Sequence, residues 1–333
     1  MRAFYDPRQL AHAPKLELHN GGFAPFAESP ARAEAIVAAL GAVEPAIDHG
    51  EVPLRAIHDE AYLAFLWSAH KDWRAAGREG DASGYAWPVV RRRPLDLDRI
   101  DAKLGAYSFD ASSPIAEGTW EGAYWSAQTA LTALDVVLAG DRSAFALCRP
   151  PGHHAGADYL GGYCYLNNAA IAAEAATAAG RRVAILDIDY HHGNGTQDIF
   201  YARGDVFFAS IHADPTTDYP YFWGHADESG EADGTGATLN LPLPRGTDLR
   251  SYLPALTHAL DAIARFAPDL LVCSFGADTF VKDPISHFRL MTEDYAPIAR
   301  KIRELDVDIV IIMEGGYATA DIGRNVSSFL HNI

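Results

Sequence analysis

Short apolar runs alternate with longer helical stretches along the chain from about residue 119 onward. The runs predict strands at 143–148, 182–188, 205–211, 269–275 and 307–313. The intervening stretches predict helices over 119–140, 167–180, about 250–266 and 292–305. An apolar run without in/out alternation is typical of a strand that is covered on both faces. We therefore expect an α/β fold with a central, mostly parallel sheet flanked by helices.

Residues 73–117 lack this pattern. The segment is rich in Gly, Pro, Arg and Asp and carries no sustained periodicity. A stretch of that length is more often a functional loop or a subunit contact than a linker inside a compact domain. Because there is no low-complexity segment, repeat or long Gly/Ser linker, we expect one domain over residues 1–333, with 73–117 as a loop-rich insertion.

The charge balance argues against a nucleic-acid partner. The chain has 44 acidic and 27 basic residues, a formal net charge of −17, whereas phosphate binding needs a basic surface. An acidic field attracts cationic ligands, although many proteins are acidic without binding any. The three cysteines form no CxxC pair, the N-terminus has no apolar signal region, and no apolar run approaches the roughly 20 residues of a membrane span. We expect a cytoplasmic protein.

Unusual polar sequence follows each of the five predicted strands. The strands lead into RPPGHHAG, DYHHGNG, HADP, GADTF and EGGYA, in that order. Ligands of open α/β sheets bind beyond the carboxyl ends of the strands. Five such strand ends predict a shared site at one edge of one sheet.

A metal is the first candidate ligand for this site. Asp187, Asp189 and His191 stand two positions apart, so an extended strand would direct all three to one side. Asp189 and His191 offer an oxygen and a nitrogen, and Asp278 can complete a three-ligand set of the kind that catalytic metals use. Asp187 would support these ligands or hold a second cation. The alternative is an ion pair or a group of polar loop residues, and the coincidence of several strand ends favours the metal.

Two further motifs suggest hydrolytic chemistry. His153 and His154 could move protons between an attacking water and a leaving group, with Asp187 and Asn194 as their expected partners. Tyr317 could donate a hydrogen bond to the oxyanion of a tetrahedral intermediate. Taken singly, a His-His pair is also a common loop feature, and a Tyr after two glycines is also a common turn residue.

Taken together, the motifs RPPGHHA, GGYCYLNNAA, LDIDYHHGNGTQ, GADTF and EGGY resemble the zinc-dependent histone deacetylase superfamily. The resemblance implies the arginase–deacetylase fold, with its active site at the C-terminal strand ends. Longer segments, such as GTWEGAYWSA, GTQDIFYARGDVFFASIHADP and DTFVKDPIS, resemble those of the acetylpolyamine amidohydrolase branch of that superfamily. That branch implies an enzyme that removes acetyl from N-acetylated polyamines and releases acetate and the free amine.

The resemblance also implies site residues, motif by motif. The implied zinc ligands are Asp189, His191 and Asp278, and the implied catalytic residues are His153, His154 and Tyr317. The implied substrate-binding residues along the channel are Tyr163, Phe222 and Gly162. A monovalent-cation site, usually potassium, is implied at Asp187, Asp189, His191, Ser210 and Ile211, and a second one at Phe200, Arg203 and Val206. Asp187 and Asn194 would orient the two catalytic histidines.

The segment 73–117 resembles the insertion that makes the polyamine branch dimeric and brings acidic residues of the partner subunit towards a cationic substrate. Alignment on GTWE places those acids at Asp101 and Ser112, and Ser112 departs from the family by having no carboxylate. Asp110 or Glu117 could substitute for it. We therefore expect a homodimer that acts on a small cationic acetylated amine, with zinc as the metal, Fe²⁺ as the alternative metal, potassium as a structural cation, and neither nucleic acid nor membrane as a partner.

Three alternatives stay open on the sequence. The substrate could be an acetyl-lysine peptide or another small acetylamide. An arginase-like ureohydrolase with two manganese ions would need a further carboxylate two residues beyond His191, where this chain has Gly193. A non-catalytic binder of acetylated amines would be favoured by loss of Tyr317 or of a metal ligand, and the chain retains both.

Overall fold

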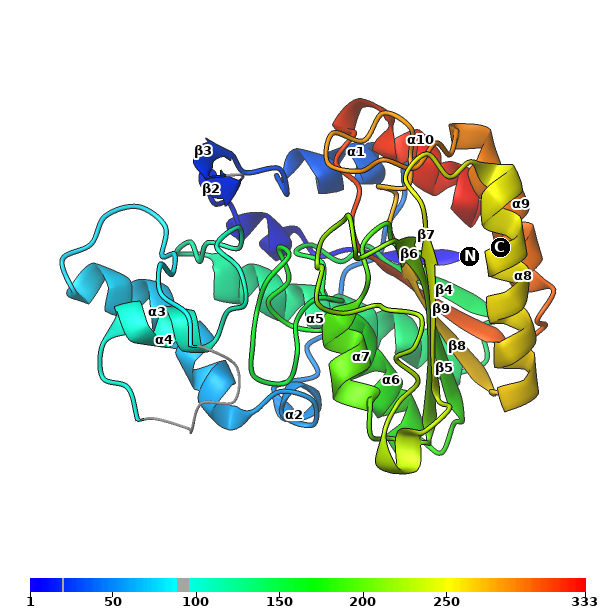
Figure 1. Cartoon of the computed structure of the whole chain (residues 1–333), viewed down its shortest axis with the longest axis horizontal. Helices are drawn as coiled ribbons and strands as arrows, with labels where there is room; N and C mark the ends of the chain where they lie inside the picture. The colour runs from blue at the N-terminus through cyan, green and yellow to red at the C-terminus, as the bar shows by residue number, and fades with distance from the viewer. Residues whose placement is uncertain (20, 89–95) are drawn as a thin grey trace.

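A seven-stranded sheet forms the centre of the protein (Figure 1). The computed structural model describes residues 1–19, 21–88 and 96–333. The strand order is β1-β4-β9-β8-β5-β6-β7, and every pair of neighbours is parallel. The strands are β1 (Arg2–Phe4), β4 (Ser143–Ala146), β5 (Val183–Asp187), β6 (Val206–Ala213), β7 (Thr238–Leu243), β8 (Leu270–Phe275) and β9 (Asp308–Met313). The prediction of an α/β fold with a mostly parallel central sheet is confirmed.

Both faces of the sheet are buried. In β5, Val183 and Ile185 belong to one hydrophobic core, whereas Ala184 and Leu186 belong to the other. All of these side chains lack solvent exposure. Because neither face meets water, the strand needs apolar residues at every position, and this is why it reads as a continuous run in the sequence.

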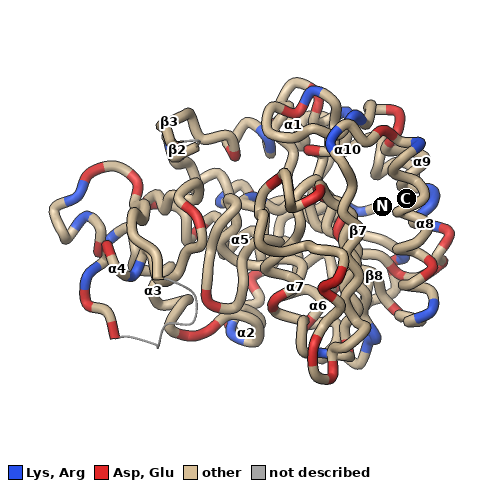
Figure 2. Tube along the Cα trace, in the orientation of Figure 1, with Lys and Arg blue, Asp and Glu red and all other residues tan. Residues whose placement is uncertain are grey.

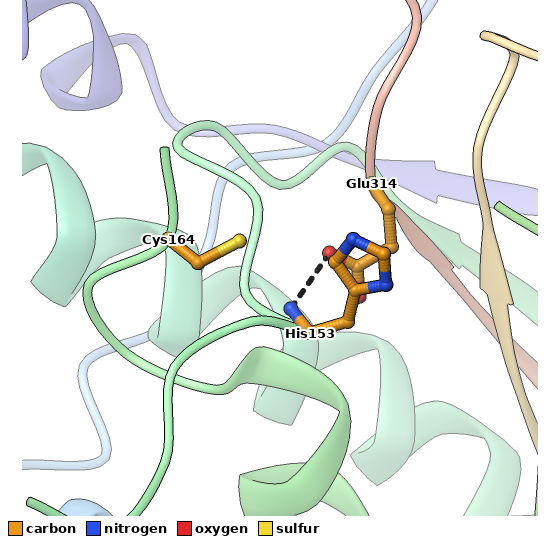
Figure 3. Close-up of side chains that lie close together, drawn as sticks. All are labelled: His153, Cys164 and Glu314. Carbon is orange, nitrogen blue, oxygen red and sulfur yellow. Dashed lines mark hydrogen bonds between the residues drawn. The ribbon is translucent and has the colours of Figure 1, made fainter. Parts of the chain in front are cut away.

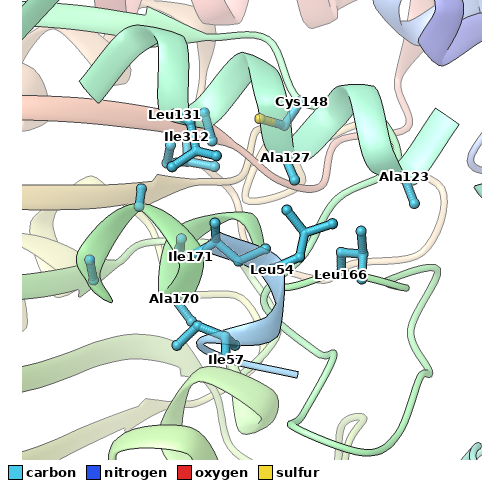
Figure 4. Close-up of a cluster of buried hydrophobic side chains, with 14 of the residues drawn as sticks. Leu54, Ile57, Ala123, Ala127, Leu131, Cys148, Leu166, Ala170, Ile171 and Ile312 are labelled. Carbon is cyan, nitrogen blue, oxygen red and sulfur yellow. The ribbon is translucent and has the colours of Figure 1, made fainter. Parts of the chain in front are cut away.

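Helices cover each face of the sheet. On one face lie α5 (Thr119–Leu138) and α6 (Asn168–Ala178), and Figure 4 shows Leu131 and Ile171 of these helices in the core that they share with Leu54 of α2 (Val52–Arg55). On the other face, α8 (Leu249–Phe266) packs on β6 and β7, while α1 (Ala31–Leu40) and α9 (Tyr295–Arg303) both contact α10 (Thr319–Leu330). The remaining elements are β2 (Leu16–His19) and β3 (Gly22–Pro25), which pair antiparallel, α3 (Glu60–Ala75), α4 (Ile100–Ala106), α7 (Asn194–Phe200), and the 3₁₀ turns at 7–11, 232–234 and 292–294.

The elements that the sequence predicted correspond to β4, β5, β6, β8, β9, α5, α6, α8 and α9. The edge strands β1 and β7 were not predicted. Strand β1 has three residues, too few for a pattern. Strand β7 contains Pro242 and is only partly buried, which an edge strand tolerates because one side of its ladder is free. Neither edge strand carries the long apolar run that identifies a central strand.

The predicted insertion at 73–117 contains two stretches of helix. Helix α3 extends into the segment as far as Ala75, and residues 100–106 form α4. Ile100 and Leu104 of α4 are buried one helical turn apart, but a helix of seven residues is too short to give a periodic signal. Helices α3 and α4 contact each other and lie at the end of the molecule away from α8 and α9 (Figure 1). Residues 89–95 of this segment lie outside the described residues.

The carboxyl ends of the central strands position the site. His153 and His154 follow β4, Asp189 and His191 follow β5, Asp278 follows β8, and Glu314 and Tyr317 follow β9. All of these strands are parallel, so the loops that leave them emerge at one edge of the sheet. Among the described residues, the structure has no helix that is both long and apolar enough to cross a membrane.

Candidate active site

Asp189, His191 and Asp278 bring their ligand atoms within 4.8 Å of one another. His191 Nδ1 lies 3.0 Å from Asp278 Oδ2 and 3.3 Å from Asp189 Oδ1. Ligand atoms about 2 Å from a zinc ion at tetrahedral angles lie about 3.3 Å apart, so the spacing suits a metal of that size. The sequence predicted this grouping, and the structure brings the three residues together.

The backbone holds both carboxylates in place. Asp189 Oδ2 accepts a hydrogen bond from the Gly315 N–H, and Asp278 Oδ1 accepts one from the Tyr190 N–H. A Cβ atom at Gly276 would lie 2.0 Å from Asp189 Oδ2, and one at Gly315 would lie 2.6 Å from Asp278 Oδ2. The two glycines therefore make room for the carboxylates, and a side chain at either position would displace one of them.

The electrostatics of this cluster favour a cation. Burial alone would lower the pKa of His191, but hydrogen bonds and charge from Asp189 and Asp278 raise it to about 10. Two buried carboxylates thus stabilise a positive charge at the position of the third ligand. A metal ion that binds there replaces the proton, since an imidazole binds a metal in its neutral form. The donor set of two carboxylate oxygens and one imidazole nitrogen fits a zinc or iron ion.

The strand that carries these residues ends earlier than predicted. Strand β5 ends at Asp187, so Asp189 and His191 lie on the following loop. The loop nevertheless alternates, because the Asp189 N–H donates to Asp187 Oδ1 and the His191 N–H donates to Asp189 Oδ1. The next residue, His192, faces elsewhere and bonds through Nε2 to Asn240 Oδ1. The alternation that the sequence suggested is therefore kept by side-chain-to-backbone hydrogen bonds rather than by a sheet ladder.

His153 and His154 have different partners. His153 Nδ1 lies 2.9 Å from Asp187 Oδ2, and His154 Nδ1 lies 2.6 Å from the Asn194 amide oxygen. Both partners are those that the sequence predicted. Because both are acceptors, each imidazole carries its proton on Nδ1.

The surroundings of the two histidines shift their pKa values in opposite directions. Burial lowers the pKa of His153, but Asp187 and Asp189 more than offset this effect and raise it to about 10. Burial and the neighbouring His153 and His191 lower the pKa of His154 well below its usual value. His154 is therefore neutral, with a free lone pair on Nε2, and His153 is the one that holds a positive charge.

A second group of side chains of the kinds that ligate metals consists of His153, Cys164 and Glu314, which lie close together (Figure 3). Glu314 Oε2 accepts hydrogen bonds from the Gly152 and His153 N–H groups, and Oε1 accepts one from Ser274 Oγ. Burial raises the pKa of Glu314 to about 7 and that of the Cys164 thiol well above its usual range. With the carboxylate engaged by protein donors and the thiol protonated, this group is less suited to bind a metal than the first.

Tyr317 lies in an aromatic cluster with Phe26 and Tyr163. Its ring centroid is 5.6 Å from that of Tyr163, and the Arg32 guanidinium carbon lies 4.9 Å from the Tyr317 ring centroid. Burial raises the pKa of the Tyr317 phenol well above its usual value. The phenol therefore keeps its proton and can act as a hydrogen-bond donor.

A cavity of about 490 Å³ opens above the cluster. The predicted residues His154, Gly162, Tyr163, His191, Phe222 and Tyr317 line it. Gly162 has a φ of +54°, and a Cβ there would lie 2.2 Å from the His154 ring, so only glycine fits. The cavity thus leads from the surface to the metal-ligating cluster.

Tyr219, which was not predicted from the sequence, lines the inner part of the cavity beside the histidines. Its ring centroid lies 5.2 Å from that of His154 and 6.0 Å from that of His191. Phe222, the predicted wall residue, is 79 % exposed and lines the cavity only at its mouth. Four aromatic residues, Tyr219, Tyr221, Phe222 and Trp223, lie within five positions of one another in the segment after β6, and sequence alone does not distinguish the inner one.

Asp110 is the carboxylate that lines the cavity beside Tyr219. Its Oδ2 accepts hydrogen bonds from the Gly162 N–H and the Tyr219 hydroxyl, and Ser112 Oγ also bonds to it. Ser112 lines the cavity as well, whereas Glu117 is exposed and is absent from the described lining. Of the two acids suggested as substitutes for the missing family acid, Asp110 is the one at the site.

Asp101 does not line this cavity. Its two carboxylate oxygens accept hydrogen bonds from Arg78 and Arg99, in a separate polar hollow beside α4. Its predicted contact with substrate requires the partner subunit. Within one chain the arginines hold it in place.

The residues of the two predicted monovalent-cation sites lie near β6. Ser210 pairs with Asp187 in the register of β6 and β5, and its Oγ hydrogen-bonds His212 Nδ1. Ile211 follows in the same buried strand. Phe200, Arg203 and Val206 lie between the end of α7 and the start of β6, where the Phe200 carbonyl accepts from the Arg203 N–H. Their cation-binding roles stay predictions.

Figure 2 shows Asp and Glu spread along the whole trace, while Lys and Arg lie mainly towards the two ends of the molecule. At the cavity itself, Arg245 is paired with Asp218 through a 2.8 Å hydrogen bond from Nε to Oδ2. This pairing neutralises the one arginine among the described lining residues, whereas the carboxylate of Asp110 pairs with no lysine or arginine in the described part of the chain.

The chain is similar in sequence and structure to known proteins. Residues 26–333 match the model of the histone deacetylase domain. The chain belongs to the histone deacetylase family. Membership in this family implies a metal cofactor, in agreement with the three-residue cluster.

Relatives within the family extend over nearly the whole chain. Acetylpolyamine amidohydrolases 1 and 2 of Pseudomonas aeruginosa are 49 % and 48 % identical, each over 99 % of this chain and 98 % of its own length. The crystal structure of acetylpolyamine aminohydrolase from Burkholderia pseudomallei superimposes with a TM-score of 0.95 at 41 % identity, covering 100 % of this chain and 98 % of that one. The arginase–deacetylase fold that the motifs predicted for this histone deacetylase family member is therefore confirmed.

Proposed function

We propose that this protein is a metal-dependent amidohydrolase that removes the acetyl group from N-acetylated polyamines. The observation that carries the proposal is one cavity with the Asp189–His191–Asp278 cluster, His154 and Tyr317 at its inner end and Asp110 in its wall. The relatives named acetylpolyamine amidohydrolase support the choice of substrate class. The chain would act as one domain over residues 1–333.

Asp189, His191 and Asp278 would hold the metal, which we propose to be zinc, with Fe²⁺ as the alternative. When bound, such a metal acts as a Lewis acid for the amide carbonyl and makes water more acidic. The ligand-atom spacing and the two glycines that border the carboxylates suit this role.

His154 would act as the general base. Its Nδ1 is engaged by Asn194, which leaves Nε2 as the lone-pair acceptor, and its pKa is lowered. His153, paired with Asp187, would stabilise negative charge and supply a proton towards the leaving amine. A proton taken from water can then be returned to the amine, which leaves as the free product with acetate.

Tyr317 would stabilise the oxyanion. Its phenol keeps its proton and faces the cavity, so it can donate to the oxygen that becomes negative as water attacks the acetyl carbon. A donor that is fixed in advance costs little reorganisation when the charge forms, and for this reason the position of Tyr317 matters as much as its chemistry.

The cavity walls would select slender cationic amides. Tyr163 and Tyr219 offer aromatic surface to a methylene chain, and Asp110 offers a carboxylate to the ammonium group beyond it. Aromatic faces also attract ammonium groups. A homodimer in which Asp101 of a second chain adds a further acid, structural potassium at the two sites near β6, and a cytoplasmic location are parts of the same proposal.

The decisive experiment measures kcat/KM of metal-loaded protein for acetylputrescine, acetylcadaverine, acetylspermidine and an acetyl-lysine peptide. We expect acetate release to be fastest with one of the acetylpolyamines, to disappear after chelation and to return with zinc. Asp278→Asn, which removes one metal-ligating charge, is the inactive control. Light scattering of the same preparation tests the dimer.

Several outcomes would overturn the proposal. A strong preference for the peptide would replace the polyamine assignment with lysine deacetylation. Two manganese ions per chain with urea release would indicate a ureohydrolase. Tight binding of acetylated amines by zinc-loaded protein without any acetate release would indicate a binding protein.

A further inference from the structure

Asp283 is a buried carboxylate whose described partners are backbone N–H groups. Its Oδ2 lies 2.6 Å from the Tyr317 nitrogen and 3.3 Å from the Ala318 nitrogen, and both groups donate to it. Its Oδ1 accepts a 3.1 Å hydrogen bond from the Ile285 N–H. Burial of this kind is costly for a carboxylate unless donors surround it, so the three N–H groups hold Asp283 in one orientation.

Asp283 and Asp278 lie on one loop. The loop follows β8 and folds back on itself, since Ser286 Oγ hydrogen-bonds the Asp278 carbonyl and the Asp283 N–H donates to the Phe280 carbonyl. One end of the loop therefore supplies a candidate metal ligand, while the other end reaches the segment that carries Tyr317.

The segment Glu314–Ala318 is held from two sides. Arg32 of α1 donates to the Glu314 carbonyl through Nη2 and to the Gly316 carbonyl through Nε. Asp283 receives the N–H groups of the next two residues. Between these contacts Gly316 has a φ of +125°, a conformation that only glycine adopts readily, so the segment depends on outside contacts to stay in this shape.

We propose that Asp283 is a positioning residue that holds the Tyr317 phenol where it stabilises the oxyanion. The inference rests on the proposed function, because it concerns the donor of that reaction. Asp283 acts on the backbone of Tyr317, and the same carboxylate fixes Ile285, another residue of the cavity lining. A single side chain thus links the metal-binding loop to the oxyanion donor.

A purely structural role has to be separated from this one. Tyr317 and Ala318 directly precede α10, so the carboxylate also anchors the segment that leads into that helix. Loss of such an anchor lowers the free energy of unfolding and leaves kcat of the folded enzyme unchanged. Loss of a positioning contact lowers kcat through Tyr317 and through nothing else.

The test is a double-mutant cycle between Asp283→Asn and Tyr317→Phe on zinc-loaded protein, with kcat, KM, zinc content and Tm measured for each variant. We expect Asp283→Asn to lower kcat by about tenfold to 100-fold, as a displaced catalytic group does, with a smaller change in KM and unchanged zinc content. In the Tyr317→Phe background the same substitution should change kcat by less than about twofold, because residues that act as a unit are not additive.

Asp248→Ala, which removes the acceptor of a helix cap, is the stability control. Asp248 caps α8 by accepting the Ser251 N–H at 3.0 Å, is exposed, and lies outside the described cavity lining. Its substitution should lower Tm and leave kcat unchanged. If Asp283→Asn does not fold, Asp283→Ser, whose hydroxyl retains one acceptor, is subject to the same cycle.

Two results would overturn the inference, and a third would overturn the proposed function on which it rests. Equal fold-losses of kcat from Asp283→Asn in the wild-type and Tyr317→Phe backgrounds would show that Asp283 acts independently of Tyr317. Unchanged kcat with lowered Tm would leave it only as a structural anchor of the segment that leads into α10. If Tyr317→Phe itself retained full activity, the oxyanion role in the proposed function would fail, and with it the basis of this inference.

Discussion

His154 Nδ1 lies 2.6 Å from the amide oxygen of Asn194. The amide is neutral, so it orients the imidazole and fixes its tautomer without adding a charge that would hold a second proton. By contrast, His153 is paired with the carboxylate of Asp187. Two adjacent histidines are thereby given opposite tendencies to hold a proton.

Asn194→Asp should move the acidic limb of the pH–rate profile to higher pH. The pKa of His154 is lowered by burial and by the neighbouring His153 and His191, and a carboxylate at 194 would raise it by about one unit or more. Because the base acts in its neutral form, a higher pKa means that more of the enzyme is protonated and inactive at low pH. The measurement is kcat/KM between about pH 5.5 and 9, and an unmoved limb would remove His154 from the role of base.

Tyr317→Phe should lower kcat by about 100-fold or more, the usual cost of losing one oxyanion donor. The substitution removes only the hydroxyl, so the aromatic contact with Tyr163 and the position above Arg32 are kept. Zinc content should stay that of the wild type, because Tyr317 is outside the ligand cluster. A variant that loses its metal as well as its activity would mean that Tyr317 supports the metal site instead.

Asp110→Asn should raise KM for acetylputrescine by about tenfold, since a hydrogen bond to a charged group contributes about 1.5–3 kcal/mol. An uncharged amide such as N-butylacetamide should show little change. Tyr219→Phe is the control, because it breaks the Tyr219–Asp110 hydrogen bond and keeps the carboxylate. If both variants raise KM for both substrates equally, Asp110 shapes the wall and does not recognise the ammonium.

Gly276→Ala should weaken metal binding. The added Cβ would lie 2.0 Å from Asp189 Oδ2, so the carboxylate must move away from the cluster. A competition titration with a zinc chelator measures the loss, which we expect to be about tenfold to 100-fold, as for other disturbances close to metal ligands. Gly22→Ala, whose Cβ would meet nothing nearer than 4.0 Å, is the control. Wild-type affinity in Gly276→Ala would contradict the assignment of Asp189 as a ligand.

The central strands were predictable because burial on both faces demands apolar residues at each position. In strand β5, Val183 and Ile185 pack in one core and Ala184 and Leu186 pack in the other. The requirement for apolar residues on both faces therefore appears in the sequence as an uninterrupted apolar run. The edge strands β1 and β7 and the short helix α4 do not meet it. Their placement depends on contacts with other elements: β1 pairs with β4, β7 pairs with β6, and α4 packs on α3.

The candidate site was predictable where its residues follow strand ends in recognisable motifs. Asp189, His191, Asp278, His153, His154 and Tyr317 were all named from the sequence, and the structure gathers them at one edge of the sheet. Their catalytic and metal-binding roles remain predictions to be tested. Tyr219 was missed in favour of Phe222, since both are aromatic and only loop geometry decides which one faces inward.

The sequence by itself determined the parallel sheet, the strand ends that carry chemistry and the identity of the candidate ligands, because periodicity and residue type are local properties. Only the tertiary structure decided that Asp110 faces the cavity while Asp101 pairs with Arg78 and Arg99, and that Asp283 meets the backbone of Tyr317. These are contacts between loops from different parts of the chain. Their distances follow from how the strands and helices pack, which no single stretch of sequence encodes.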